Sequence, residues 1–173
     1  DKPEFTHTII PNHPVHYGGS YTIPDDKYVE FLDIYHRDVF EQGKEAYLTE
    51  KHKDFSPVLI DLDFRFKLED SNRQYTDEFI VEYLKCYIEE AKELLNIKGH
   101  IEIFVLEKTK PKVDKEKKLV KDGIHIIIPK LLTLPMIQYI LRYKMINNER
   151  VQDILSKLGI TNPIEDVIDI CVI

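Results

Sequence analysis

The chain contains 173 residues, of which 43% are hydrophobic and 10% aromatic, so it can bury a globular core and is interpreted as a single domain over residues 1–173. Its formal net charge of −7 argues against a general nucleic-acid coat protein, because phosphate binding depends on a basic excess, although a local basic groove is still compatible with it. No apolar run approaches the roughly 20 residues that span a bilayer, and no signal peptide is recognisable, so we expect a soluble, intracellular protein with no membrane partner.

The N-terminal part of the sequence is predicted to contain one helix and one short strand. Residues 5–23 are rich in histidine, proline, glycine and tyrosine. After residues 24–26, apolar side chains recur at helical spacing, and Gly43 is expected to end this helix. The apolar stripe consists of Tyr28, Phe31, Leu32, Tyr35 and Val39. Residues 46–49 have the composition of a short strand.

Residues 57–66 predict a strand that emerges from the core. A continuous apolar start gives way there to strict alternation of apolar and polar side chains. Thr76 can cap the long helix that follows, in which apolar residues recur every three or four positions as far as Leu95.

The remaining elements complete an α+β pattern. Strands are predicted over residues 101–107 and 123–128, the second closed by Pro129, and they are expected to form an antiparallel hairpin. Helices are predicted over residues 135–147 and 149–158, the latter capped by Gly159, before a terminal strand from Val167. Because helices and strands are mixed without a regular βαβ repeat, the sequence predicts an α+β sheet with helices packed against it.

The connection between the two hairpin strands is strongly basic. Residues 108–121 contain seven lysines and only two acidic residues. This pattern is typical both of a solvated hairpin tip and of a loop that contacts phosphates, and the sequence leaves both interpretations open.

Two carboxylates lie close together on the strand predicted over residues 57–66. Alternation places Asp61 and Asp63 on the same face, roughly 7 Å apart, while Leu62 points into the core. Such a pair suits Mg²⁺ or Mn²⁺, which stabilise the attacking and the leaving oxygen in phosphoryl transfer. Two exposed aspartates on an amphipathic strand are the simpler explanation. Aspartate is disfavoured in strands, however, and these two follow a fully apolar run, which favours a metal site.

His125 and Asp169 are polar exceptions in two other predicted strands. His125 is the one polar side chain in the apolar run of residues 123–128, and Asp169 is the one charged residue in residues 167–173. Each alone is more typical of ordinary structure than of a ligand. If one sheet contains all three strands, it can present both side chains with Asp61 and Asp63 on a single face, which predicts an active site.

Three motifs occur in an order that resembles the archaeo-eukaryotic primase superfamily. They are residues 59–65 (LIDLDFR), residues 122–126 (DGIHI) and residues 167–169 (VID). More closely, the chain is similar to the primase domain of primase-helicases from nucleocytoplasmic large DNA viruses of the poxvirus, asfarvirus and mimivirus type. The resemblance covers nearly the whole chain and implies an α+β catalytic core with a mostly antiparallel sheet and packed helices.

The resemblance implies a role for each of the four central residues. Asp61 and Asp63 match the carboxylates of the first motif and Asp169 matches the aspartate of the third. These three aspartates are therefore expected to be catalytic and to hold two Mg²⁺ or Mn²⁺ ions. His125 matches the histidine of the second motif, which in the family contacts the phosphates of the incoming nucleotide.

Three further residues are expected to bind nucleotide. Arg65 follows the carboxylate pair on the same face, where it can contact a phosphate or only pair with Asp63. Many relatives have serine two residues before the histidine, whereas this chain has Gly123. The missing hydroxyl contact is therefore assigned to backbone N–H groups or to Lys121.

The activity that the resemblance implies is that of a primase or primase-polymerase, a DNA-directed nucleotidyltransferase. It would join nucleoside triphosphates on a single-stranded DNA template to make primers for viral-type DNA replication, in the host cytoplasm or nucleus. The chain would be an excerpt of a longer parent with a C-terminal helicase domain. Four residues are candidates for the template groove or for ordinary surface packing: His7, His13, His16 and Tyr17.

Other functions stay open at this point. A catalytically silent module of the same fold could bind nucleic acid without binding a triphosphate through a metal. A divalent-metal nuclease would need a nearby Glu or Lys, for which Lys67 is the candidate. A nucleotide-sugar glycosyltransferase is disfavoured, because 173 residues leave little room for a nucleotide domain ahead of the carboxylate pair.

Overall fold

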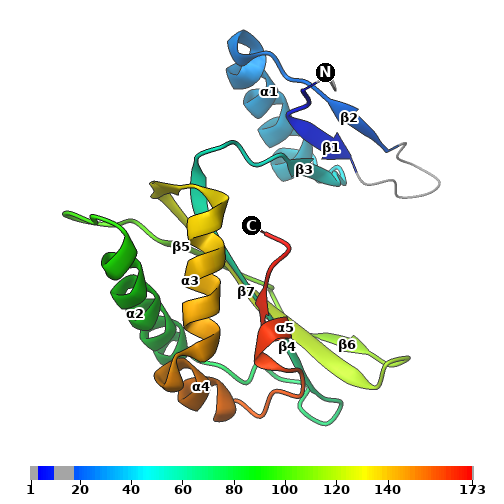
Figure 1. The fold of residues 1–173 in the computed structure, drawn as a ribbon. Helices are drawn as coiled ribbons and strands as arrows, with labels where there is room; N and C mark the ends of the chain where they lie inside the picture. The colour runs from blue at the N-terminus through cyan, green and yellow to red at the C-terminus, as the bar shows by residue number, and fades with distance from the viewer. Residues whose placement is uncertain (1–3, 10–17, 173) are drawn as a thin grey trace. The chain divides into compact units, whose positions relative to one another are not determined.

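The computed structural model describes residues 4–9 and 18–172 (Figure 1). The single domain predicted over residues 1–173 contains two compact units, residues 1–53 and 54–173, each with a sheet of its own. All described strand pairs are antiparallel. Helices accompany both sheets, which confirms the predicted α+β class.

The first unit packs one helical segment onto a small sheet. Strands β1 (His7–Ile9), β2 (Gly19–Tyr21) and β3 (Leu48–Glu50) pair in the order β2-β1-β3. The helical segment runs through η1 (Asp25–Lys27), α1 (Tyr28–Tyr35) and a π-helical turn, η2 (His36–Glu41). Gly43 follows with φ of +66°, which agrees with its predicted role as the stop. Strand β3 begins two residues later and ends one residue later than the strand predicted over residues 46–49.

The second unit builds a five-stranded sheet and four helices from the described residues 54–172. The strands are β4 (Ser56–Lys67), β5 (Phe104–Glu107), β6 (Lys112–Asp114), β7 (Leu119–Thr133) and β8 (Ile168–Asp169). The helices are α2 (Asp77–Leu94), α3 (Pro135–Asn147), α4 (Glu149–Ser156) and α5 (Ile164–Val167). The main strand order is β5-β7-β4-β8, and β6 also pairs with β7.

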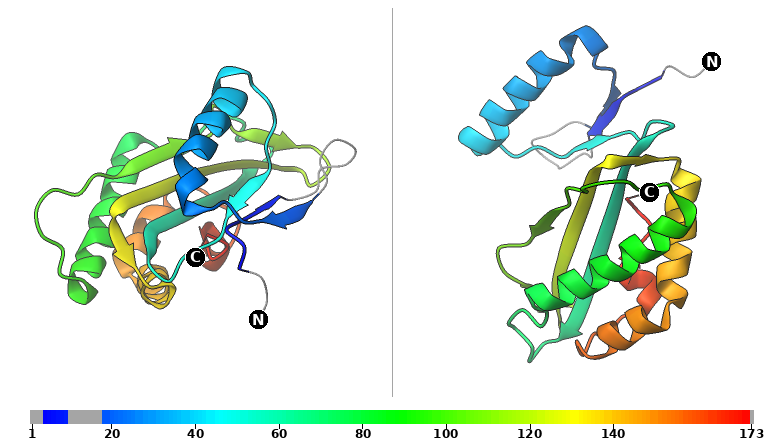
Figure 2. Two further views of the ribbon diagram at one scale, coloured as in Figure 1. Left: turned by 90° about the horizontal axis from the view of Figure 1, so that it is seen from above. Right: turned by 90° about the vertical axis from the view of Figure 1, so that its left-hand side faces the viewer.

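The core lies between this sheet and the helices α2, α3 and α4, which lie on the same side of β4 and β7 (Figure 2). Along β4 every second side chain from Ser56 to Phe66 is buried, and those between are only partly buried. This strict period is what the pleat of a strand produces when one face meets a core. The residues between the buried ones, which include Asp61 and Asp63, therefore share the other face.

Several predicted elements are confirmed at or near their predicted ends. Thr76 is the N-cap of α2, and its hydroxyl accepts a hydrogen bond from the Phe79 N–H at 3.4 Å. Helix α3 has the predicted bounds, with Pro135 in its first turn. Gly159 has φ of +70° beyond the end of α4. The predicted hairpin of β5 and β7 forms in antiparallel register.

The prediction that Pro129 closes its strand is wrong. Strand β7 continues through Pro129 to Thr133. Its pairing with β4 shifts at this point, because Val58 is opposite Ile128 but Pro57 is opposite Leu132. The residues between Ile128 and Leu132 thus form a bulge, a place where a proline without an N–H is tolerated inside a strand.

Three smaller differences concern the basic connection and the chain end. Strand β5 begins at Phe104 rather than at residue 101. The lysine-rich segment is partly ordered as a hairpin, in which β6 pairs with residues 119–121 of β7. The terminal strand begins one residue after Val167, because residues 164–167 form the helical turn α5.

Among the helices of the described residues, none combines the length and apolar character needed to cross a bilayer.

Candidate active site

Three strands that are distant in the sequence meet at Asp61. On β4, Asp61 is directly opposite His125 of β7 on one side and Asp169 of β8 on the other. Residues directly opposite across an antiparallel ladder point to the same face, with Cα atoms about 4.5–5.5 Å apart. The structure therefore brings together, in one row, the residues that were predicted from three separate motifs.

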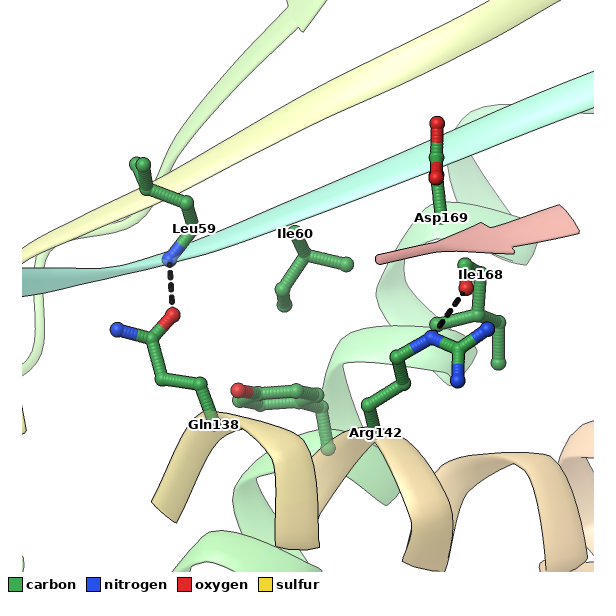
Figure 3. Close-up of a pocket in the computed structure, with 7 residues that line it drawn as sticks. Leu59, Ile60, Gln138, Arg142, Ile168 and Asp169 are labelled. Carbon is green, nitrogen blue, oxygen red and sulfur yellow. Dashed lines mark hydrogen bonds between the residues drawn. The ribbon is translucent and has the colours of Figure 1, made fainter. Parts of the chain in front are cut away.

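The carboxylates face away from the helices. Leu62 and its cross-strand neighbours Ile124 and Ile168 are at most 3% exposed and belong to the core. Figure 3 shows the Asp169 side chain pointing away from α3, whereas Ile168 points toward the helices. Because side chains alternate along each strand, Asp61 and Asp169 lie on the opposite face of this sheet from α2, α3 and α4.

Asp61 is the electrostatic centre of the row. Its side chain is 17% exposed, and burial is the largest influence on its pKa, which is raised. The charge of His125 acts in the opposite direction, whereas the carboxylates of Asp169 and Asp63 raise the pKa further, and Lys108 partly offsets them. Burial and two neighbouring negative charges disfavour the ionised form of Asp61, and this environment favours the binding of a cation.

His125 is held by Asp61 and reaches outward. Its Nδ1 lies 3.4 Å from Oδ1 of Asp61, while the His125 side chain is 55% exposed. With Nδ1 turned toward the carboxylate, Nε2 is the ring nitrogen left to face a ligand. His125 is therefore both anchored to the carboxylate centre and accessible.

Asp169 is positioned by contacts that the sequence did not reveal. Arg142 of α3 donates from Nε to the main-chain oxygen of Ile168 at 2.7 Å and from Nη2 to that of Glu165 at 2.6 Å. The Asp169 carboxylate also accepts a hydrogen bond from the Cys171 N–H at 3.0 Å. Burial alone would raise the pKa of Asp169, but hydrogen bonds from the following residues outweigh it and lower the pKa. This carboxylate is therefore held ionised beside Asp61.

Two side-chain amides occupy the outer edge of β4 on either side of β8. The Gln138 amide accepts from the Leu59 N–H at 3.1 Å and donates to the Pro57 oxygen at 3.1 Å (Figure 3 shows the first of these bonds). The Asn162 amide accepts from the Arg65 N–H and donates to the Asp63 oxygen, both at 2.9 Å. Each amide satisfies strand groups that β8 does not reach, so β8 is confined to the two positions that place Asp169 opposite Asp61.

The predicted nucleotide-binding cations lie at one shared ladder position, four residues along β4 and β7 from this row. Arg65 is opposite Lys121 on the same face. Its guanidinium lies 3.8 Å from the Asp63 carboxylate and 3.7 Å from that of Asp166, which are ion pairs rather than close hydrogen bonds. The Lys121 ammonium lies 4.0 Å from Asp114 of the β6 hairpin. Both cations are partly exposed and share the face of the carboxylates.

Gly123 stands between these residues, opposite Asp63, where the sheet permits no larger residue. A Cβ atom at this position would lie 2.7 Å from the main-chain oxygen of Leu62. The glycine is therefore a packing requirement of the β4–β7 pair in this chain.

We expect Gly123→Ala and Gly123→Ser to lower the free energy of unfolding by about 1–3 kcal/mol, because the strand backbones must move apart to admit a Cβ atom. Urea unfolding monitored by circular dichroism measures the effect. The matched control is Lys121→Ala, two residues along the same face, which introduces no Cβ and should change stability by no more than about 0.5 kcal/mol. Equal stability of Gly123→Ala and the native chain would contradict the steric argument.

Lys108 belongs to the site but was not predicted individually. It is the residue after β5, and extending the β5–β7 register by one step places it opposite Gly123. Its Nζ lies 3.6 Å from the point where a Cβ on Gly123 would stand, and its charge lowers the pKa of Asp61. The sequence showed a basic segment, but only the hairpin register identifies which of its lysines reaches the carboxylates.

Comparison with known proteins identifies the family. The family model described as the C962R protein N-terminal AEP domain matches residues 6–173, where AEP denotes archaeo-eukaryotic primase. The chain belongs to this archaeo-eukaryotic primase family. The resemblance predicted from the three motifs is thereby confirmed at the level of the family.

A viral relative supports the same assignment. A protein of Acanthamoeba polyphaga mimivirus with the name "Putative helicase L207/L206" is 34% identical over 152 residues. The aligned segment is 87% of this primase-family chain but only 16% of the mimivirus protein. The chain therefore corresponds to a small part of that much longer relative.

The carboxylates of this primase-family domain have the donor chemistry for divalent ions. Asp61, Asp63 and Asp169 supply carboxylate oxygens on one face, as Mg²⁺ and Mn²⁺ prefer. Over residues 4–9 and 18–172, no three metal-ligating side chains converge closely enough to form a ready-made cluster. Burial and then the charges of Asp169 and Asp63 raise the pKa of Asp61, and a cation bound at these carboxylates would compensate both effects.

The candidate template-groove residues of the first unit are only partly described. His7 is 3% exposed, and its ring lies 5.2 Å from that of Phe31, centroid to centroid. The Thr6 hydroxyl lies 2.8 Å from its Nδ1. His7 thus belongs to the interior of its unit, as ordinary packing would have it. His13, His16 and Tyr17 lie outside the described residues.

Proposed function

We propose that this chain is the catalytic domain of a primase-polymerase, which joins nucleoside triphosphates on a single-stranded DNA template to make primers for DNA replication. The observation that carries the proposal is the row formed by His125, Asp61 and Asp169, with Asp63 next to it on the same face. Family membership makes a nucleotidyltransferase the appropriate enzyme class for this row.

In the proposed mechanism, Asp61, Asp63 and Asp169 hold two Mg²⁺ or Mn²⁺ ions. When bound, these ions lower the pKa of a primer 3′-hydroxyl and neutralise charge on the triphosphate, so that in-line attack on the α-phosphorus expels pyrophosphate. Asp61, which is opposite Asp169 and two residues before Asp63, would hold these ions together with the other two carboxylates. The hydrogen bonds that hold β8 in register keep Asp169 ionised and in place for this task.

His125 has the position of a phosphate-binding group. In the imidazolium form, with its Nδ1 facing the Asp61 carboxylate, His125 can donate a hydrogen bond from Nε2 to a triphosphate oxygen and stabilise charge on the leaving phosphates. Arg65 and Lys121 add positive charge farther along the same face. Template phosphates would be held on this face by contacts that carry no sequence information.

The name of the mimivirus relative extends the proposal to the parent protein. That relative is named as a helicase and is much longer than the segment it shares with this chain. We infer that the domain acts beside a helicase domain on the same polypeptide, with synthesis at the replication site of a virus.

A divalent-metal nuclease is the alternative that the geometry addresses most directly. Its candidate lysine, Lys67, is four residues beyond Asp63 on β4, which corresponds to about 13 Å along a strand. Lys67 is therefore too far from the carboxylates to share their reaction. Metal-dependent binding of a nucleoside triphosphate would distinguish the enzyme from the catalytically silent module.

We expect the chain to bind a labelled nucleoside triphosphate in a Mn²⁺-dependent manner. His125→Ala should weaken this binding about 10- to 100-fold, the effect of losing one hydrogen bond to a charged group. Asp61→Asn/Asp63→Asn should remove the dependence on Mn²⁺. Fluorescence anisotropy of a labelled triphosphate measures both, and primer extension on a single-stranded template then tests synthesis.

The exposed residue His36 of η2 provides a matched control, since His36→Ala removes the same side chain from the other unit. Binding of single-stranded DNA without metal-dependent triphosphate binding would indicate the silent module instead. Mn²⁺-dependent cleavage of DNA without extension would indicate the nuclease. Either result would overturn the proposed activity.

A further inference from the structure

One ammonium group reaches the carboxylate centre from the basic hairpin. On β5, Leu106 is opposite His125, so the next residue on that face, Lys108, continues the row toward Gly123. Its Nζ lies 3.6 Å from the position of a hypothetical Gly123 Cβ, and the Asp63 Cα lies 3.8 Å from that same point. The ammonium therefore lies over the strand backbone at Gly123 and Asp63, close enough to Asp61 for its charge to act on that carboxylate.

Gly123 has no side chain between the strand backbone and this ammonium. Any side chain at position 123 would collide with the main-chain oxygen of Leu62 and would project toward the Lys108 Nζ. This chain places a lysine from the neighbouring strand over this position. An ammonium supplies a positive charge and three N–H donors there.

The other candidate lysine points elsewhere. Lys121 lies within 4.0 Å of the Asp114 carboxylate on the hairpin, at the ladder position of Arg65. Among the ion pairs within 4.0 Å that the described residues form, none involves Lys108. Its charge is therefore not committed to a single carboxylate and can respond to an anionic ligand.

The backbone that carries Lys108 is fixed to the interior. The guanidinium of Arg73 donates a short hydrogen bond to the main-chain oxygen of Lys108. The same guanidinium donates to the Asp122 carboxylate, which is fully buried, at 3.0 Å and to Glu107, also at 3.0 Å. The main chain at Lys108 is thus held in place by a hydrogen bond, unlike that of a lysine at a hairpin tip.

We propose that Lys108 is the phosphate-binding lysine of this site, which supplies the contact that Gly123 cannot make. The inference rests on the proposed function and deepens it by assigning the role left open between backbone groups and Lys121. An ammonium beside two aspartates also balances their charge before a ligand arrives, and a triphosphate then takes over this contact.

Two possible roles of Lys108, phosphate binding and a purely structural role, predict different effects of its substitution on ligand binding. Lys108→Met keeps the aliphatic stem but removes the charge. If Lys108 binds phosphate, this variant weakens binding of a non-hydrolysable nucleoside triphosphate about 10- to 100-fold, the effect of one charge-assisted hydrogen bond. Binding of Mn²⁺ alone should be unchanged or tighter, because a like charge near Asp61 and Asp63 is gone. Loss of structure would weaken both ligands together.

The experiment is isothermal titration of the triphosphate analogue and of Mn²⁺ alone into matched variants. Lys108→Arg should retain most of the affinity, and Lys115→Met, in the exposed turn of the same hairpin, should change it less than about 3-fold. Lys121→Met tests the competing assignment.

Each outcome decides a separate point. If the native chain binds the triphosphate and His125→Ala weakens it, but Lys108→Met does not, the assignment of Lys108 is overturned and the proposed function stands. A larger loss in Lys121→Met than in Lys108→Met would return the role to Lys121. A native chain that binds no triphosphate would overturn the proposed function and this inference with it.

Discussion

Asp61→Asn should lower the rate of nucleotidyl transfer about 10³-fold or more, while the metal-free protein becomes no less stable than the native chain. Asp61 is the residue that both His125 and Asp169 face, so its loss affects contacts to either side. A 10³-fold loss corresponds to about 4 kcal/mol of transition-state stabilisation, a reasonable effect for removal of a shared metal ligand. Single-turnover primer extension with saturating Mn²⁺ measures the rate.

The expectation that metal-free Asp61→Asn is no less stable than the native chain follows from the raised pKa of Asp61. Burial, then the charges of Asp169 and Asp63, make its ionised form less favourable in the folded than in the unfolded chain, against the opposing charge of His125. A group with a raised folded pKa contributes stability at low pH that is lost as the pH rises from about 4 through that pKa. The asparagine does not titrate, so the variant should gain stability relative to the native chain over this window.

Thermal unfolding in EDTA between pH 3 and pH 8 tests the difference, and added Mn²⁺ should then stabilise the native chain but not the variant. The control is Asp153→Asn, an exposed ion-pair aspartate of α4 that should alter neither extension nor the Mn²⁺ response. Extension within about 10-fold of native in Asp61→Asn would show that Asp61 is not a shared ligand. Lower stability of the variant throughout the pH range would contradict the electrostatic argument.

The local geometry of the site could be predicted because strands have a period of two residues. Asp61, Asp63 and Arg65 had to share a face once residues 57–66 formed a strand, and the buried Leu62 and Phe64 confirm it. Local sequence patterns also predicted the apolar face of α2 and its N-cap, Thr76. In each case the relevant contacts lie within a few residues of one another in the sequence.

Strand order and register could not be derived this way. That His125 and Asp169 flank Asp61, rather than lying one or two residues along, depends on pairing between segments more than forty residues apart. The motif order of a known family supplied this information, and the residues alone would have left it open. The continuation of β7 through Pro129 was missed for the same reason, because a bulge is a property of two strands.

The supporting contacts were also inaccessible to sequence patterns. Gln138 and Arg142 lie one turn apart on α3, where the sequence predicted only a helix. Their polar ends satisfy main-chain groups of β4 and β8, an assignment that requires the helix to lie against the sheet edge. Lys108 is similar, since its role depends on the glycine of a neighbouring strand. Side chains that act through main-chain partners have no residue-type pattern to recognise.

Arg73→Ala should be the most destabilising single substitution considered for this chain, with a loss of about 3–5 kcal/mol in the free energy of unfolding. The Asp122 carboxylate is 0% exposed on the helix-covered face of β7. Arg73 compensates it with a 3.0 Å hydrogen bond from Nε and a 3.4 Å one from Nη2, and the Gly123 N–H donates a third bond at 2.9 Å. Removal of the arginine leaves a buried charge without its partner, the costliest way to break such a pair.

The double variant Arg73→Ala/Asp122→Asn separates this cause from simple loss of packing. An amide at position 122 can still accept from the Gly123 N–H but carries no charge, so the double variant should be more stable than Arg73→Ala alone. Urea unfolding of the native chain, both single variants and the double variant gives the coupling energy. A double variant no more stable than Arg73→Ala would mean that Arg73 acts by packing, for example against Tyr75, whose ring centroid lies 4.9 Å from the guanidinium carbon.

The same cycle reports on the active site, because Arg73 also holds the main-chain oxygen of Lys108. Asp122→Asn keeps Arg73 in place, so it should leave triphosphate binding close to native even where it lowers stability. Arg73→Ala/Asp122→Asn lacks the hydrogen bond to the main-chain oxygen of Lys108. It should therefore weaken triphosphate binding although it is more stable than Arg73→Ala. If the recovery of stability restored full affinity as well, the anchored backbone would have no part in phosphate binding, and the link from the buried pair to the site would be refuted.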